Sequence, residues 1–190
     1  MQQRQGPDRQ SGGRDDTFAW LVAFARALAL ILTPFSRRDF GFRSFRSAPG
    51  LAVLYIVGFA GVSGSPLVLG FLWVWLLAVA AQRLRTSQHN RKGIVVHSDY
   101  DGFPLLGWKL CRGRSEEAAY KAEIGFWLLV STVAVLADAT CGVFLLIATA
   151  GLLVFETYKR ERDRKMLADM RDARIEQHYR AAQFRNAGPF

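Results

Sequence analysis

The chain has 190 residues, of which 51% are hydrophobic and 13% aromatic, and this composition excludes a disordered protein. Its formal net charge of +9 would favour a nucleic-acid partner in a soluble protein. Here the Lys and Arg residues collect in short polar segments beside long apolar runs, as in the cytoplasmic loops of membrane proteins, so we expect no nucleic-acid partner.

Residues 1–16 are polar, carry acids and do not resemble a signal peptide, so we expect a disordered tail. Residues 17–36 form the first apolar block, with Arg26 near its centre. About nine large apolar residues only roughly outweigh the cost of one Arg, about 2.5–3.5 kcal/mol, so insertion across a bilayer is marginal. An interfacial or re-entrant helix is slightly favoured over a full span, which would put the N-terminus outside.

Two longer apolar runs follow. Residues 51–81 carry no charge, and residues 124–155 carry one, Asp138. A single helix over 31 residues would reach about 47 Å, whereas a bilayer core of about 30 Å needs about 20 residues. Each run has a break near its middle, G-V-S-G-S-P at 61–66 and A-D-A-T-C-G at 137–142. The pattern therefore predicts two short membrane hairpins, at 48–82 and 124–156.

The basic residues favour the same layout. They cluster before the first run, after it and after the second run, and neither central break contains Lys or Arg. If each run is a hairpin, all these clusters lie on one face, as the positive-inside rule requires of the cytoplasmic face. The clusters are Arg37, Arg38, Arg43 and Arg46; Arg83, Arg85, Arg91 and Lys92; and Lys159, Arg160, Arg162, Arg164 and Lys165.

Asp138 falls at the tip of the second hairpin in this layout. There its side chain is expected to cap the N-terminus of the following helix, a role that Asp often has. A buried ion or proton site is the alternative, because an intramembrane acid is often functional. Arg26 and Asp138 are thus the two candidate functional residues of the membrane segments.

Residues 83–123 are predicted to be a cytoplasmic loop, with a short surface helix capped by Ser115. His97, Asp99 and Asp101 alternate and could offer ligands to a divalent cation, but this spacing is weak, and a solvated turn or docking loop is preferred. Aromatic and polar residues of the loop are expected to contact a partner or the membrane surface. These candidates are His97, Tyr100, Phe103 and Trp108.

Residues 157–190 lack a sustained heptad pattern and are predicted to form a charged cytoplasmic helix rather than a coiled coil. Five of the seven residues 159–165 are Lys or Arg, which favours contact with anionic lipid headgroups. The distal part, with Ile175, Tyr179 and Phe184, is expected to bind another protein.

The sequence therefore predicts an all-α integral membrane protein with two short helical hairpins, an N-terminal interfacial or re-entrant helix and a charged C-terminal cytoplasmic helix. We find no catalytic, phosphate-binding or metal motif, and expect neither an enzyme nor a cofactor. Cys111 and Cys141 support no disulfide framework or zinc site.

The function expected is that of a small subunit or scaffold of a larger membrane complex, such as secretion, conjugation or envelope machinery, in a bacterial inner membrane. Its partners would be other membrane subunits, a cytoplasmic protein and anionic lipid, in an oligomer or hetero-complex. The alternative is a pore-forming or transport subunit built from oligomerised hairpins. A peripheral protein on anionic lipid or nucleic acid is a third reading, and it would leave membranes in high salt.

Overall fold

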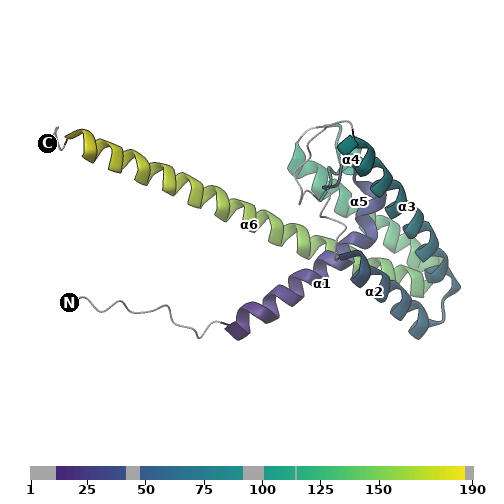
Figure 1. Ribbon diagram of the computed structural model, residues 1–190. Helices are drawn as coiled ribbons and strands as arrows, with labels where there is room; N and C mark the ends of the chain where they lie inside the picture. The colour runs from purple at the N-terminus through teal and green to yellow at the C-terminus, as the bar shows by residue number, and fades with distance from the viewer. Residues whose placement is uncertain (1–11, 42–47, 92–100, 114, 187–190) are drawn as a thin grey trace. The chain divides into compact units, whose positions relative to one another are not determined.

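The computed structural model describes residues 12–41, 48–91, 101–113 and 115–186, and within them it is helical, with no strand (Figure 1). By contacts the chain divides into two compact units, Met1–Phe155 and Glu156–Phe190. The helices are α1 (Gly12–Ser36), α2 (Ala48–Ser63), α3 (Pro66–Arg91), α4 (Leu105–Leu110), α5 (Glu116–Ala137) and α6 (Ala139–Asn186).

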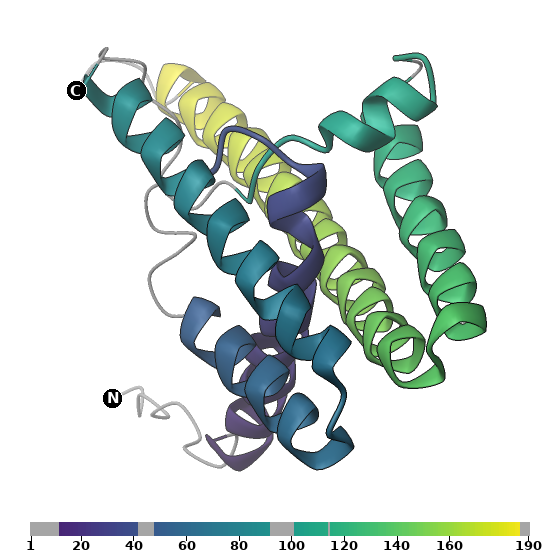
Figure 2. The ribbon, with the colours of Figure 1, turned by 90° about the vertical axis from the view of Figure 1, so that its right-hand side faces the viewer.

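Helix α1 lies in the middle of the first unit, between the α2–α3 pair and the α5–α6 pair (Figure 2). Its side chains from Ala27 to Leu32 are almost wholly buried. Leu28 packs on Gly151 of α6, where an added Cβ would overlap the Leu28 side chain. The missing side chain at Gly151 therefore lets two helices approach closely, as small residues do between membrane helices.

Aromatic side chains fill the space between α2, α3 and α6. The ring of Phe144, which is fully buried, lies with its centroid 5.6 Å from Tyr55, 5.3 Å from Phe59 and 5.4 Å from Phe71. Aromatic pairs at such distances stabilise a core beyond the area that they bury.

Pro34 leaves one backbone carbonyl of α1 available to a side chain of α3. Proline has no backbone N–H, so the carbonyl of Leu30, four residues earlier, lacks its helical donor. Trp75 of α3 supplies a donor: its indole Nε1 lies 3.0 Å from the Leu30 oxygen. The indole is 1% exposed, so this bond is formed away from solvent.

Two further side chains of α3 donate hydrogen bonds to backbone carbonyls at the end of α1 and just beyond it. The Gln82 amide nitrogen donates to the carbonyls of Pro34, at 3.1 Å, and Arg37, at 2.9 Å. The Thr86 hydroxyl donates to the Phe40 carbonyl at 3.3 Å. Positions 75, 82 and 86 share one face of α3. Their side chains donate hydrogen bonds to carbonyls that have no helical donor at or after the end of α1.

The outer surface of the first unit is strongly apolar. In the part of the chain that the structure describes, four helices are long and apolar enough to cross a membrane, at Ala19–Ser36, Pro66–His89, Glu116–Ala137 and within Ala139–Gln183, and α2 is a shorter apolar helix. Only 22% of the most apolar stretch of α3, and of α5, is buried, so most of their apolar residues face outward. An apolar surface of this extent suits hydrocarbon rather than water, and it indicates a membrane protein.

Both predicted breaks coincide with helix ends. Helix α2 ends at Ser63, Gly64 takes a left-handed φ of 65°, and α3 begins at Pro66. Between α5 and α6, Asp138 accepts a hydrogen bond from the Cys141 N–H at 2.9 Å, which confirms the predicted cap. The layout of these helices across a bilayer stays a prediction.

Other boundaries differ from the prediction. Residues 12–16, predicted to be part of the tail, belong to α1, because a formed helix extends at little cost. The Ser115 cap is confirmed by a bond of 3.1 Å from the Ala118 N–H, but the helix that it starts is no separate surface helix, because it continues as α5 to Ala137. Helix α3 likewise extends beyond residue 82, to Arg91.

We expect Trp75→Phe to lower the free energy of unfolding by about 1–3 kcal/mol, because it leaves the Leu30 carbonyl buried without its donor. The measurement is denaturant unfolding of the purified protein in detergent. Trp73→Phe is the matched control, since Trp73 is 70% exposed on the same helix. Equal effects of the two substitutions would contradict the role of the indole hydrogen bond.

Candidate functional site

A buried ion pair joins the end of α1 to α5. The Arg37 guanidinium donates from Nε to Glu123 Oε1 at 2.9 Å and from Nη2 to Oε2 at 2.7 Å, and neither side chain is exposed at all. The Ser36 hydroxyl also donates to Glu123 Oε1, and the Tyr120 ring centroid lies 5.1 Å from Arg37 Cζ. The carboxylate thus accepts several donors, which offsets the cost of burying its charge.

The segment around α4 covers this pair. Phe103 and Arg38 exchange backbone hydrogen bonds of 3.1 and 2.7 Å, an isolated antiparallel bridge. Gly107 lies so close to α5 that an added Cβ would overlap the Ala119 carbonyl. Glycine at this position therefore lets α4 lie directly on the turn of α5 that precedes Glu123.

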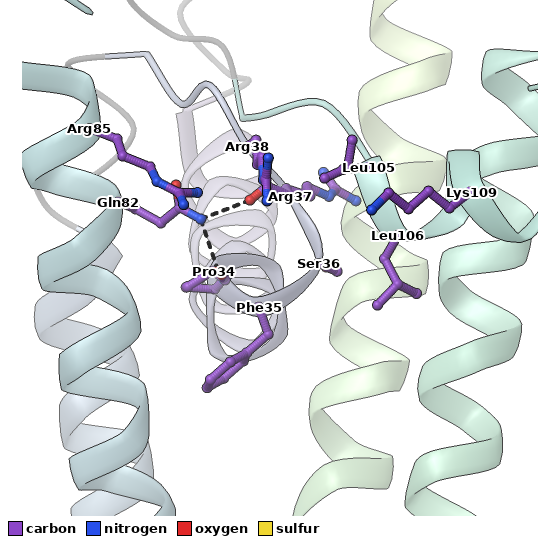
Figure 3. A pocket seen from close by; sticks show the side chains of 10 residues that line it. All are labelled: Pro34, Phe35, Ser36, Arg37, Arg38, Gln82, Arg85, Leu105, Leu106 and Lys109. Carbon is purple, nitrogen blue, oxygen red and sulfur yellow. Dashed lines mark hydrogen bonds between the residues drawn. The ribbon is translucent and has the colours of Figure 1, made fainter. Parts of the chain in front are cut away.

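Beside the ion pair is an open pocket of about 390 Å³, between the end of α1, the last turns of α3 and α4. Figure 3 shows Arg85 and Lys109 extending toward each other from opposite sides, with Arg38 between them. Four of the lining residues are Lys or Arg and none is acidic. The lining residues are Pro34, Phe35, Ser36, Arg37, Arg38, Gln82, Arg85, Leu105, Leu106 and Lys109.

The charges in the pocket differ in their environment. Arg37 is buried and neutralised by Glu123. Arg38, Arg85 and Lys109 are exposed, and none of them forms an ion pair with an acid in the part of the chain that the structure describes. Asp39, which follows Arg38, lies instead with its Oδ1 3.6 Å from His89 Nδ1, a contact that is an ion pair when His89 is protonated. The pocket therefore presents three positive charges that no described acid neutralises.

The two predicted membrane-functional residues lie apart from this pocket and have partners of their own. Arg26 forms an ion pair with Asp101, Nη2 to Oδ1 at 3.2 Å, and both side chains are partly exposed. Asp138 caps α6. Each residue therefore has a structural role, and the structure does not bring the two together.

The predicted partner-binding residues divide into two groups. Phe103 and Trp108 are half-buried and pack on each other, with ring centroids 5.5 Å apart. Ile175 and Tyr179 on α6 are 49% and 70% exposed. His97, Tyr100 and the Phe184 side chain lie outside the described residues.

Of the weak metal motif His97, Asp99 and Asp101, only the last residue is among those that the structure describes. His97 and Asp99 lie outside the described residues, and Asp101 pairs with Arg26. Among residues whose placement is described, no group of three His, Cys, Asp or Glu side chains could hold a metal ion. The arrangement suits the binding of an anion rather than of a cation, because the unneutralised charges of the pocket are all positive.

Sequence patterns indicate Arg37 only as one of the basic residues beside an apolar run, and they indicate neither Gln82 nor Glu123. One signal was available: each polar side chain lies at the edge of an apolar run, where burial requires a partner. The sequence does not identify that partner, because Arg37 and Glu123 are 86 positions apart.

We expect Glu123→Leu alone to lower the free energy of unfolding by about 3–5 kcal/mol, because it leaves the Arg37 charge buried without its counterion. The double variant Arg37→Met and Glu123→Leu should lose less than the sum of the two single variants. A double-mutant cycle by denaturant unfolding in detergent measures this coupling. The control is Glu117→Gln in the exposed pair with Lys121, expected to cost about 0.3–0.5 kcal/mol. Additive effects at 37 and 123 would contradict the coupling.

Comparison of the chain with protein-family models, with curated proteins and with solved structures finds no match.

Proposed function

We propose that the protein is an integral membrane subunit that acts as a scaffold through protein–protein contacts in a larger membrane complex, of the secretion, conjugation or envelope type. The observation that carries this proposal is the exposure of the second unit. All of the residues from 161 to 183 are exposed. A long helix with no covering of its own is typical of a segment that binds a partner.

The surface of this helix combines charge with small apolar patches. Lys165 Nζ lies 3.9 Å from Glu161 Oε1, an ion pair at i,i+4, and Glu176 and Arg180 form a second such ion pair. Such pairs add a few tenths of a kcal/mol each to a helix that stands in water. The large apolar side chains between and beside them are about half to 70% exposed. These are Met166, Leu167, Met170, Ile175 and Tyr179.

The membrane layout that we propose has two hairpins, α2–α3 and the pair formed by α5 with the first part of α6, with the basic segments on the cytoplasmic side. The α2–α3 turn and the α5–α6 turn lie at the same end of the first unit, as Figure 2 shows, and neither carries Lys or Arg. The end of α1 and the last turns of α3, which carry basic residues such as Arg37 and Arg85, lie toward the opposite end (Figure 2). This charge asymmetry supports the orientation.

A pore or transport subunit stays the alternative, and it would require several copies of the chain. The space between α2, α3 and α6 is filled by aromatic rings, including the buried Phe144. Arg26 and Asp138, which motivated a transport path, have partners within the chain. A path for ions would therefore have to form between protomers.

Single cysteines test the orientation. In a Cys111→Ser and Cys141→Ala background, Ser63→Cys lies at the α2–α3 turn and Ser87→Cys near the end of α3, and both positions are exposed. We expect an impermeant thiol reagent to label Ser63→Cys in cells with a permeabilised outer membrane, and Ser87→Cys only after lysis. The reverse pattern would show an inverted protein, and labelling of both in unlysed cells would show that α3 does not cross.

Deletion of residues 172–190 tests the scaffold function. We expect the truncated protein to insert normally, because the hairpins lie upstream, and to lose a cytoplasmic partner in co-purification from mild detergent, measured by mass spectrometry. Ile175→Ala with Tyr179→Ala should lose the same partner, because their side chains are exposed. The matched control is Glu176→Ala with Arg180→Ala on the same helix turns, which should retain it. If the truncated chain keeps every partner, the scaffold proposal fails and the pore alternative moves ahead.

A further inference from the structure

The pocket beside the Arg37–Glu123 pair has features that neither the scaffold function nor the stability of the fold requires. Arg38, Arg85 and Lys109 surround a space of about 390 Å³ without a described acid to neutralise them. Like charges that converge on one site raise its energy unless an anion binds there. The volume is in the range of small-molecule sites.

The backbone walls of the pocket are held in place before any ligand binds. Gln82, itself buried, bonds to the Pro34 and Arg37 carbonyls, as the dashed lines in Figure 3 show. The bridge to Phe103 fixes the backbone of Arg38. Little ordering of the backbone is therefore needed on binding, and this favours affinity.

The lining is also divided by polarity. In Figure 3, Phe35 and Leu106 point away from the three cationic groups. The Phe35 ring packs against the rings of Phe71 and Trp127. Phe35, Leu105 and Leu106 are each partly exposed. A ligand that fits such a pocket carries an anionic group at one end and an apolar group at the other.

We infer that this pocket binds the phosphate of an anionic phospholipid, with Arg38, Arg85 and Lys109 around the phosphate and Phe35 and Leu106 against the glycerol and the first methylenes of the acyl chains. Guanidinium and ammonium groups are the usual partners of phosphate oxygens. Basic pockets between membrane helices on the cytoplasmic side are suited to such headgroups. The inference rests on the proposed membrane layout, which puts this end of the helices at the headgroup level.

Native mass spectrometry of the purified protein in neutral detergent tests the inference. The probes are phosphatidylglycerol, phosphatidylcholine and inorganic phosphate, added separately. We expect saturable binding of one phosphatidylglycerol, at least tenfold tighter than phosphatidylcholine. The double variant Arg85→Gln and Lys109→Gln should weaken it roughly 25-fold, at about fivefold per positive charge lost.

Arg91→Gln is the matched control, because Arg91 is exposed on the same helix as Arg85 but does not line the pocket. It should change the affinity less than twofold. Lys109→Gln alone, at an exposed position of the short α4, replaces the double variant if the latter does not fold. Circular dichroism and gel filtration check folding.

Three results would overturn the inference. Equal weakening by Arg91→Gln and the double variant would indicate diffuse surface attraction and no site. Equal binding of the two lipids would remove the requirement for a net anionic headgroup. Displacement by millimolar inorganic phosphate with no preference among lipids would assign the pocket to a soluble phosphate compound. Extraction of membranes with alkaline carbonate tests the membrane proposal separately, so failure of lipid binding is distinguishable from failure of that placement.

Discussion

The buried pair of Arg37 and Glu123 is the interaction on which the basic end of the first unit depends. Both charges are fully withdrawn from solvent, so each is tolerated only while the other is in place. The same residues anchor their neighbours: the Arg37 carbonyl accepts from Gln82 of α3, and the turn of α5 before Glu123 receives α4 through Gly107. Helices α1, α3, α4 and α5 therefore meet at one polar junction, and the pocket walls are formed by three of them.

This junction separates two kinds of positive charge. The Arg37 guanidinium is matched by one carboxylate and serves the packing of the helices. The neighbouring Arg38, together with Arg85 and Lys109, is left at the surface of the pocket without a described acid. Adjacent residues in the chain thus have opposite roles, because the end of α1 directs one side chain into the protein and leaves the next one exposed.

Local features of the fold were predictable from the sequence, and long-range ones were not. The turn at 61–66 and the caps Ser115 and Asp138 follow from residue types that act on their own few neighbours, and the structure confirms them. The bond from Trp75 to Leu30 and the pair of Arg37 with Glu123 join residues 45 and 86 positions apart. Nothing in a single sequence specifies which distant helices pack together, so neither the junction nor the pocket could be predicted from it.

The proline in α1 has a consequence for when the hydrogen bonds of this helix can form during synthesis of the chain. Pro34 leaves the Leu30 carbonyl without its helical donor, and the Pro34 carbonyl lies in the last turn of α1. Trp75 donates to the first of these carbonyls and Gln82 to the second. A ribosome synthesises those residues tens of positions later, and Asp101, the partner of Arg26, later still. Helix α1 is therefore synthesised before the side chains that donate hydrogen bonds to its last carbonyls. The Leu30 carbonyl therefore gains its donor only once α3 packs against α1.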